Sequence, residues 1–507
     1  MFRRRQWGTG AQLRRGGSEP YLMSGLSLLL QATLACVLVL LALLSLQLLG
    51  LTLLRRFCPM RNVPFASRPD SALPHVLVQL PVCDEGALAI RVARAAAQLD
   101  WPRDRLEIQL LDDGHAERHD ELRKAVEAAV PPGTNLRIMR RGERSGFKAG
   151  NLAFGLRHSN APYVAIFDAD FEPAPDFLRR TVPALLTDSG LAFVQARWTH
   201  ANRARNWLTR AQGLLLDGHF AVEQEARFRT GLPISFNGTA GVWNRRAIDQ
   251  SGGWTGDTLT EDLDLSMRCA LRGWRAALLS DVEVSGELPE SAAAWRAQQA
   301  RWTKGHAQVA RKLLPQILAS GLPLWKKAVL SFQICQFAFY TLAGLSACIS
   351  LTLMGMGVIY LQAVAGLGIG VTIIGAGASV GYLYCGQAML GRARERLLPQ
   401  SLLLAIVFPS GLILSNARAT FEAFSSSEME FVRTPRRGEF AACGWRGRPE
   451  LAAGLLLPVI ALAERAWSAP FFVFAAAGLV SIGAMGWSGS GSLPAAKALP
   501  RRQSELI

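Results

Sequence analysis

The sequence predicts an α/β domain that is inserted between membrane-spanning helices. Residues 22–54 contain no charged residue, and this run is longer than the roughly 20 apolar residues that a membrane crossing requires. Residues 328–391 are also uncharged and leave room for two crossings. Between these runs, short apolar segments alternate with helical patterns. This alternation is typical of a mostly parallel sheet with helices on both of its faces.

The first apolar run, residues 22–54, has two other interpretations. A buried core helix would be shorter, and a signal peptide would have a shorter apolar region closed by a clean A-x-A cleavage site. A retained membrane anchor is therefore favoured. Of the later apolar segments, 401–415 is short and holds Pro409, so we expect an interfacial helix there. Residues 451–463 form a shorter segment still, and 471–487 are about one span long.

The net charge of +16 suggests either nucleic-acid binding or contact with anionic lipid. The basic clusters flank the apolar segments, and the sequence holds no nucleic-acid-binding motif. We therefore expect membrane lipids and an anionic substrate as partners, and no nucleic acid. The eight cysteines include no C-x-x-C pair, so neither a zinc site nor a disulfide framework is indicated.

The α/β domain is predicted over residues 75–320, after a tail and anchor at 1–74. Transmembrane and interfacial helices are predicted at 321–490, followed by a disordered tail at 491–507. Within the domain, strands are predicted at 75–81, 106–113, 136–140 and 163–170, and helices at 87–99, 119–130 and 174–186.

Acidic residues cluster where the predicted strands end. They are Asp84 and Glu85 after the first strand, Asp112 and Asp113 after the second, and Asp168 and Asp170 after the fourth. Ligands of parallel sheets bind at these strand ends. A single acid there is often an ordinary turn residue or helix cap, but several would repel one another unless positive charge lies among them. A D-x-D pair suits Mg²⁺ or Mn²⁺ held together with a nucleotide diphosphate.

Two further stretches agree with an anionic ligand. The segment SGFKAGN places Lys148 in a glycine-flanked loop that opens a helix, where backbone N–H groups and a lysine suit an anion. The segment TLTEDLDLSMRCALRG is typical of a helix capped by Thr260, with Glu261 and Asp262 in its first turn. Acids at that position also simply complement the helix dipole, which favours their ionised form.

A helix is predicted over residues 291–305, and one of its faces carries aromatic and amide side chains. Trp295, Gln298, Gln299 and Trp302 are spaced so that they share this face. Indoles and amides together suit a sugar, which presents both flat apolar surface and hydroxyl groups. Arg301 is available for a phosphate.

At this point the sequence resembles a known family. The motifs LDDG, KAGN, DAD, TED and QQARW occur in the order found in membrane-bound family-2 glycosyltransferases, which include cellulose synthase and hyaluronan synthase. The stretches FNGTAGVWNRRAI, TEDLDLSMRCALRGW and ELPESAAAWRAQQARW are most similar to the mannan and glucomannan synthase branch. The resemblance covers roughly residues 75–440. Each motif alone is weak, but five in order between membrane segments are specific.

The resemblance implies a GT-A catalytic domain that inverts the anomeric centre with the help of Mg²⁺ or Mn²⁺. It implies that Asp262, with Glu261 beside it, is the general base and that Asp168 and Asp170 hold the metal. It further implies donor contacts from Asp84, Glu85, Asp112 or Asp113, Lys148 and Arg301, and acceptor contacts from Gln298, Trp302 and Asn237. One departure is the segment PVCDE, in which Asp84 stands where relatives usually carry Asn.

The segment EFVRTPRRGE at 430–439 resembles the gating loop of these synthases. The resemblance implies that Thr434, Arg436 and Arg437 reach the donor diphosphate. The alternative is a charged loop with no gating role.

The resemblance implies a processive enzyme that transfers hexose from GDP-mannose or UDP-glucose to a β-linked polysaccharide and translocates the product. A glycolipid synthase shares every acidic motif and remains the alternative, whereas an inactive scaffold conflicts with the intact signature. We expect an integral protein of the plasma (inner) membrane with a cytoplasmic catalytic domain. Arginines such as Arg3 and Arg14 precede the first apolar run. Residues 22–54 therefore either form a tight hairpin or break the positive-inside rule.

Overall fold

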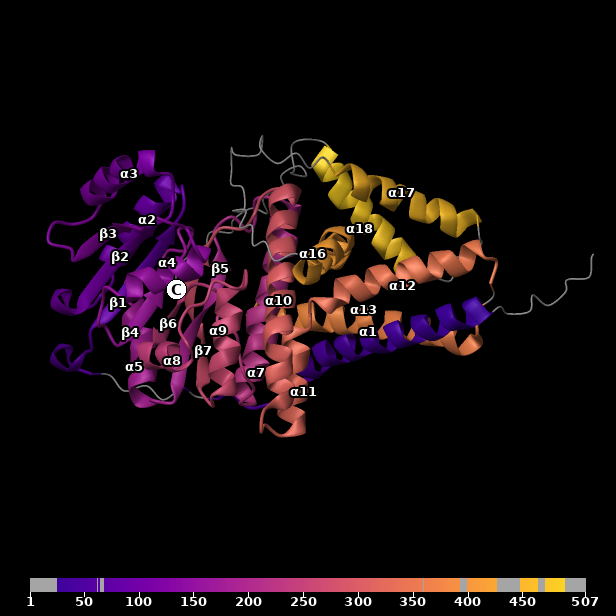
Figure 1. The fold of residues 1–507 in the computed structure, drawn as a ribbon, viewed down its shortest axis with the longest axis horizontal. Helices are drawn as coiled ribbons and strands as arrows, with labels where there is room; N and C mark the ends of the chain where they lie inside the picture. Colours follow the sequence, from indigo (N-terminus) through magenta and orange to yellow (C-terminus); the bar gives the residue numbers. More distant parts are fainter. Residues whose placement is uncertain are drawn as a thin grey trace, which may run out of the picture.

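The computed structural model describes residues 25–61, 63, 68–358, 360–392, 399–425, 447–463 and 470–487. Figure 1 shows two parts, a layered α/β region and an elongated group of helices, with the long helix α10 (Ala292–Ala319) standing between them. Helix α1 (Gly25–Phe57) belongs to the helical group although it precedes the α/β region in the sequence. The α/β region is therefore inserted between apolar helices, as the sequence predicts.

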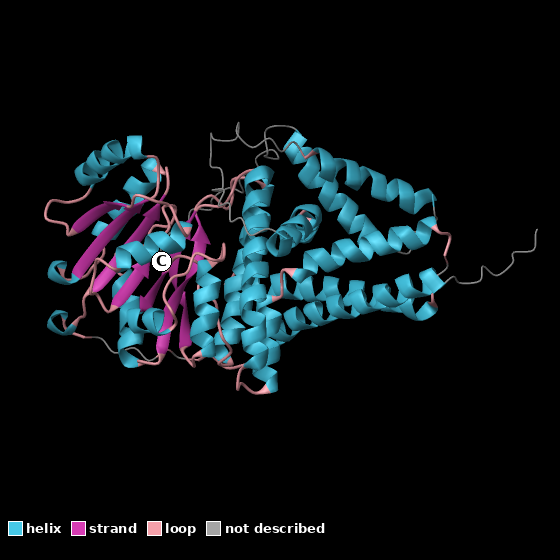
Figure 2. Ribbon diagram, in the orientation of Figure 1, coloured by secondary structure: helices cyan, strands magenta, loops and turns pink. Residues whose placement is uncertain are grey.

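A seven-stranded sheet forms the centre of the α/β region (Figure 2). Its strands are β1 (Val76–Val82), β2 (Leu106–Asp112), β3 (Leu136–Arg140), β4 (Tyr163–Ile166), β5 (Leu191–His200), β6 (Gly241–Asn244) and β7 (Arg275–Gly286). The spatial order is β3-β2-β1-β4-β6-β5-β7. Neighbours are parallel except at β6, which runs antiparallel to β4 and β5. The mostly parallel sheet is confirmed, and the four predicted strands correspond to β1 to β4.

Helices cover the sheet and connect its strands. They are α2 (Gly86–Ala97), α3 (Ala116–Ala129), α4 (Phe147–Leu156), α5 (Phe177–Thr187), α6 (Trp207–Gly218), the π-helical turn η3 (His219–Gln224), α7 (Glu225–Arg229), α8 (Arg245–Gln250) and α9 (Glu261–Leu271). Short 3₁₀ turns lie at Asp70–Ala72 and Arg103–Arg105. All seven residues of β1 are buried, which requires covering layers on both faces because alternate side chains of a strand point to opposite sides.

The helical group follows α10 in the chain. It consists of α11 (Leu324–Ile334), α12 (Ala338–Gly355), α13 (Gln362–Met389), α15 (Pro399–Ser410), α16 (Ile413–Ser425), α17 (Arg448–Ala463) and α18 (Pro470–Trp487). Among the described residues, α1, α12 and α13 are the three helices long and apolar enough to cross a membrane. The anchor and the two later crossings are thus present as candidate spans.

Two expectations about the helical group are wrong. The first apolar run is one continuous helix of 33 residues, so the tight-hairpin alternative fails. The predicted single interfacial helix at 401–415 is divided between α15 and α16. The division lies at Gly411, where an added Cβ would come 2.3 Å from the Gly478 carbonyl oxygen of α18. Close packing against α18 therefore accompanies the break that follows Pro409.

Candidate active site

One large cavity lies where the central strands end. Its volume is about 1160 Å³, and residues of both the α/β region and the helical group line it. The α/β wall includes Asp168 and Asp170, which follow β4. The lining also includes Leu48 of α1, Tyr340 of α12 and Tyr382 of α13. The cavity therefore extends from the strand ends, where ligands of such sheets bind, toward the candidate membrane helices.

Four acids and a lysine meet in this cavity. Asp168 and Asp170 come from the loop after β4, Glu261 and Asp262 begin α9, and Lys148 lies in the first turn of α4. The Lys148 Nζ atom is 2.5 Å from Asp168 Oδ1 and 3.8 Å from Glu261 Oε1. Burial would lower the pKa of Lys148, but the neighbouring carboxylates hold this pKa well above its ordinary value. The lysine thus supplies the positive charge that a cluster of acids requires.

The Asp262 carboxyl is half-buried beside a second carboxyl, that of Glu261. Burial first, and then the charge of Glu261, raises the pKa of Asp262 to about 7. Burial likewise raises the pKa of Glu261. This corrects the expectation that the helix dipole keeps Asp262 ionised, because loss of water and the neighbouring charge outweigh the dipole. A group that exchanges its proton near neutrality is suited to general acid–base chemistry.

A glycine allows the close approach of the chain to this cluster. Gly238 has a φ angle of +79°, and an added Cβ would lie 3.1 Å from Asp262 Oδ2 and 3.4 Å from Lys148 Nζ. The Gly238 carbonyl oxygen also accepts a hydrogen bond of 2.8 Å from Lys148. Any other residue here would be strained in backbone conformation and would press on the Asp262 carboxyl.

The acids that follow β1 and β2 divide into two groups. Among the described residues, the cavity lining includes Glu85 and Asp113 but not Asp84 or Asp112. Asp113 accepts two hydrogen bonds from Arg141, of 2.8 Å from Nε and 2.6 Å from Nη2. Asp112 and Asp113 are the two alternatives for one predicted donor contact. Of the two, the structure brings Asp113 to the cavity.

Asp84 and Asp112 are used within the protein instead. Asp84 Oδ1 accepts a hydrogen bond of 2.9 Å from the His115 backbone N–H. Asp112 is buried, and its Oδ2 atom lies 2.7 Å from His119 Nδ1. Both carboxylates hold the loop after β2 in place. Their assignment to the donor stays a prediction, since both carboxylates are engaged within the protein and neither lines the cavity.

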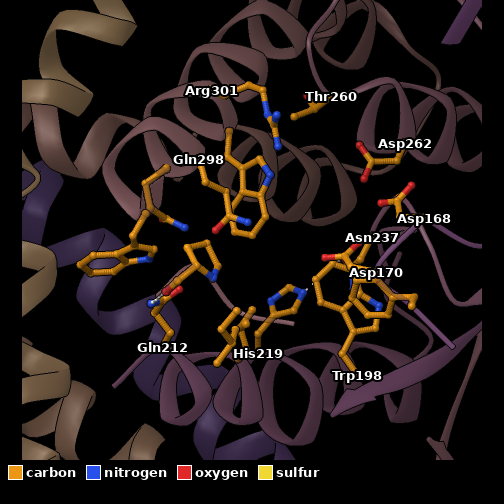
Figure 3. A pocket seen from close by; sticks show the side chains of 18 of the residues that line it. Asp168, Asp170, Trp198, Gln212, His219, Asn237, Thr260, Asp262, Gln298 and Arg301 are labelled. Carbon is orange, nitrogen blue, oxygen red and sulfur yellow. Dashed lines mark hydrogen bonds between the residues drawn. The ribbon is translucent and has the colours of Figure 1, made fainter. Parts of the chain in front are cut away.

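Helix α10 supplies another wall of the cavity. Gln298, Gln299, Arg301 and Trp302 all line it, as does Trp295, and Figure 3 shows Arg301 and Gln298 on the side opposite His219. Burial lowers the pKa of Arg301, while the charges of Glu261, Asp168, Asp262 and Asp170 act to raise it. The guanidinium therefore lies within electrostatic reach of all four cavity acids.

Trp295 departs from the predicted sugar-binding face. Its side chain is only 3 % exposed and belongs to an apolar cluster with Tyr382 and Phe408. The indole is therefore mainly a core side chain that joins α10 to the helical group. Trp302, one of the lining residues, is half-buried, which leaves its ring accessible to a ligand.

Thr260 begins α9 as predicted, but its side chain makes no capping hydrogen bond. The Thr260 side chain packs instead against Gly305 of α10, where an added Cβ would lie 2.5 Å from Thr260 Cγ2. The start of α9 and helix α10 are therefore tightly packed at this point.

Several cavity residues escaped the sequence reasoning. They are Trp198, Asn202, His219, Glu223, Gln333 and Gln336. Asn237, which the resemblance assigned to the acceptor, also lines the cavity. One signal for His219 and Glu223 was present: in the mostly apolar stretch LLLDGHFAVEQ, these two ionisable residues are four positions apart and therefore share a helix face. The predicted gating residues Thr434 and Arg436 lie outside the described residues.

A divalent metal fits the donor end of the cavity. The described residues hold no group of three or more His, Cys, Asp and Glu side chains that would bind a metal alone. Asp168 and Asp170 provide two half-buried carboxylates in the cavity wall. Mg²⁺ in enzymes commonly takes one or two carboxylates and completes its shell with water and substrate phosphates. Two carboxylates therefore suit a metal that is bound together with a diphosphate.

The chain is similar to known glycosyltransferases. Residues 163–365 match the model of the glycosyl transferase family group 2. The chain is 44% identical over 263 residues to glucomannan 4-beta-mannosyltransferase 7 of Arabidopsis thaliana, covering 51% of this chain and 47% of that protein. It is 42% identical over 287 residues to glucomannan 4-beta-mannosyltransferase 1 of Oryza sativa subsp. japonica, covering 54% and 55%. The chain thus spans about half the length of the curated relatives it matches.

A solved structure shows the same fold. The mannosyltransferase PcManGT from Pyrobaculum calidifontis, in complex with GDP-Man and Mn²⁺, superimposes with a TM-score of 0.52 at 22% identity. The match covers 73% of this chain and 100% of that one. The predicted fold class, an α/β GT-A domain flanked by apolar helices, is confirmed. Over residues 163–365 the chain is thus similar to glycosyltransferases of family group 2.

Proposed function

We propose that this protein transfers hexose from a nucleotide sugar, GDP-mannose or UDP-glucose, to a growing β-linked glycan with inversion at the anomeric carbon. One observation carries the proposal: a single cavity joins a lysine-neutralised acid cluster to a wall of indole and amide side chains. The first part suits a diphosphate with its metal, and the second suits a sugar chain. The names of the glucomannan mannosyltransferase relatives support the same reaction.

At the donor end, Asp168 and Asp170 would hold Mg²⁺ or Mn²⁺. The bound ion would supply positive charge for the diphosphate that leaves. Arg301 and Lys148 add charge beside it. Asp113 lines the part of the cavity nearest β2, in agreement with the proposed contact to the nucleoside.

At the acceptor end, Asp262 acts as the general base. Its carboxylate takes the proton of the attacking acceptor hydroxyl as the new glycosidic bond forms and the bond to the diphosphate breaks. The neighbouring Glu261 makes Asp262 more basic through its negative charge. Trp302 stacks on an acceptor sugar, and Gln298 and Asn237 hydrogen-bond its hydroxyl groups.

The product is proposed to leave toward the membrane helices. The cavity continues to Leu48, Tyr340 and Tyr382, which belong to the three candidate spans. With this path we propose a cytoplasmic catalytic domain and a location in the plasma membrane. The predicted gating loop at 430–439 lies outside the described residues. The same opening toward the helices would also admit a lipid acceptor, which keeps a glycolipid synthase as the second candidate.

The proposal is tested by presenting membranes that contain the purified protein with GDP-mannose and UDP-glucose separately. We expect one donor to yield a saccharide of high mass that a linkage-specific β-mannanase or β-glucanase degrades. Chelation with EDTA should stop the reaction, and added Mg²⁺ or Mn²⁺ should restore it. A product that extracts wholly into organic solvent would favour the glycolipid synthase, and no transfer from either donor would overturn the proposed reaction.

A further inference from the structure

The helix that follows β5 is interrupted by a π-helical turn at the cavity. Helix α6 continues into η3, which spans His219–Gln224, before α7 completes the segment. Isolated π-helical turns are rare and occur frequently at functional sites. Here the turn presents His219 and Glu223 to the cavity, and the proposed reaction uses neither residue. Figure 3 shows His219 and Gln212 across the cavity from Gln298 and Arg301.

A network of hydrogen bonds fixes His219 in one orientation. Its Nδ1 atom lies 3.1 Å from Glu223 Oε2. The other Glu223 oxygen accepts a hydrogen bond of 3.1 Å from Gln336 and lies 3.4 Å from Arg227 Nε. Burial would raise the pKa of Glu223, but His219, Arg227 and Gln336 together hold this pKa well below its ordinary value. Glu223 is therefore a fixed carboxylate that orients the His219 ring.

The same turn fixes Asn237. The Gln224 amide exchanges two hydrogen bonds with the Ser235 backbone, of 2.8 Å and 3.3 Å, which determines where its oxygen and nitrogen lie. Gln224 Nε2 and His219 Nε2 then each lie 3.3 Å from Asn237 Oδ1. The Asn237 Nδ2 group is buried and has no hydrogen-bond partner among the described residues. A buried donor in a cavity wall is costly unless a ligand satisfies it.

Membrane-type helices hold the turn from its other side. Arg55, at the end of α1, donates a hydrogen bond of 2.7 Å from Nε to the Ala221 carbonyl oxygen within the turn. Just before the turn, an added Cβ on Gly218 would lie 2.3 Å from the Tyr382 ring of α13. The turn therefore faces the cavity on one side and contacts two candidate membrane spans, α1 and α13, on the other.

We propose that the turn His219–Gln224 forms an acceptor subsite, in which His219 and Asn237 bind hydroxyl groups of the glycan and Glu223 positions His219. Neutral sugar hydroxyls both donate and accept hydrogen bonds, and the subsite offers an imidazole edge and an unsatisfied amide donor. The cavity lining also offers four uncharged amides, Gln212, Gln298, Gln333 and Gln336. The inference rests on the proposed function and adds the residues that recognise the acceptor.

The test separates acceptor binding from donor chemistry. Wild-type protein, His219→Ala, His219→Gln and Glu223→Gln are assayed with the preferred nucleotide sugar, first with water as the only acceptor and then with β-linked oligosaccharides of two to six units. The exposed His158 lies outside the cavity, so His158→Ala serves as the matched control.

We expect His219→Ala to raise the acceptor KM about tenfold, the equivalent of ~1.4 kcal/mol, with donor KM and donor hydrolysis unchanged. His219→Gln keeps a side-chain donor and should recover part of the loss, and Glu223→Gln should raise the acceptor KM by a smaller factor. His158→Ala should match wild type. An unchanged acceptor KM in His219→Ala, or a parallel loss of donor hydrolysis, would overturn the subsite. Absence of donor turnover in the wild type would instead overturn the proposed function.

Discussion

At the scale of single residues, the site depends on how charge is distributed around Asp262. Glu261 and Asp262 lie in the first turn of α9, and Lys148 reaches them from the first turn of α4. Lys148 also pairs with Asp168, which belongs to the proposed metal site. The positive charge of Lys148 therefore lies beside both the proposed base and a proposed metal ligand. This charge would link the acceptor and donor parts of the proposed reaction electrostatically.

The first prediction concerns Asp262→Asn, which keeps the size of the side chain but cannot accept a proton. Loss of a general base typically lowers the rate by a factor of about 10² to 10⁴, and we expect a loss of that order in sugar transfer. Donor affinity should change little, because Asp262 is assigned to the acceptor side. Turnover and nucleotide-sugar affinity are measured on the same preparation, and affinity that falls in proportion to turnover would move Asp262 to the donor site.

The same variant should be no less stable than wild type at pH 8. The pKa of Asp262 is raised from 3.8 to about 7, so the folded protein keeps a proton that the unfolded chain has lost between these values. Stability therefore falls as pH rises through this window. Asparagine removes this cost. An unfolding temperature that drops at pH 8 would mean that ionised Asp262 stabilises the fold.

The second prediction concerns the pH dependence of transfer. Asp262 must be ionised to act as a base, and its pKa is about 7. The value of kcat/KM should therefore be low in acidic solution and rise as the pH increases through neutrality. This is measured with saturating metal between pH 5.5 and 8.5. A rate that stays constant down to pH 5.5 would show that a carboxyl of ordinary pKa is the base.

At the scale of secondary-structure elements, the contact between α9 and α10 sets the position of Asp262, the proposed base, relative to Trp302, the proposed acceptor contact. The contact is made by Thr260 and Gly305, which leave no room for an additional methyl group. Asp262 follows Thr260 by two residues, and Trp302 precedes Gly305 by three. A change in this packing therefore moves the base relative to the sugar-binding face.

The third prediction is that Gly305→Ala lowers kcat while the protein still folds. Alanine is the better helix former by about 1 kcal/mol, so an intrinsic loss of helix stability is not expected. The added Cβ would meet Thr260 Cγ2 at 2.5 Å and displace the start of α9. Gly321→Ala is the control, since nothing lies within 4 Å of an added Cβ there. Equal activity of the two variants would refute the role of this contact.

The elements also show what the sequence could and could not predict. Strands β1 and β4 were recognisable as short apolar runs, and β2 and β3 as short segments in which apolar residues alternate with polar ones. The antiparallel strand β6, GVWN, is as short as β4 but has only two large apolar residues, so it lacks such a run. The roles of Asp84 and Asp112 were not predictable, since strand order brings both acids to one edge but loop contacts decide which carboxylate faces the cavity.

At the scale of the whole molecule, the cavity connects the catalytic domain with the candidate membrane helices. Its lining runs from Asp113 beside the sheet to Tyr382 in α13. The joint between the two parts is polar as well as apolar: buried Asp217 of α6 accepts a hydrogen bond of 2.8 Å from Gln387 of α13. A buried charge held across this joint favours one relative placement of catalytic domain and membrane helices.

The sequence predicted this arrangement only in outline. Apolar runs identified α1, α12 and α13, because hydropathy and length depend on local sequence alone. The cavity lining could not be derived in this way, since Leu48, Tyr340 and Tyr382 are ordinary apolar-segment residues whose shared position depends on tertiary packing. The continuity of the first helix excludes the tight hairpin, one of the two alternatives that the charge distribution left open.

The central claim is that one cavity builds a glycan by repeated transfer, and Trp302 tests it most directly. If its indole stacks the chain end, every elongation cycle depends on a contact worth about 1 kcal/mol beyond burial. Product size is therefore compared between wild type and Trp302→Ala at equal donor consumption, with Trp325→Ala, an exposed tryptophan on α11, as control. We predict a long product from wild type and Trp325→Ala, and a shorter product or mainly donor hydrolysis from Trp302→Ala. A Trp302→Ala product as long as that of wild type would contradict the account.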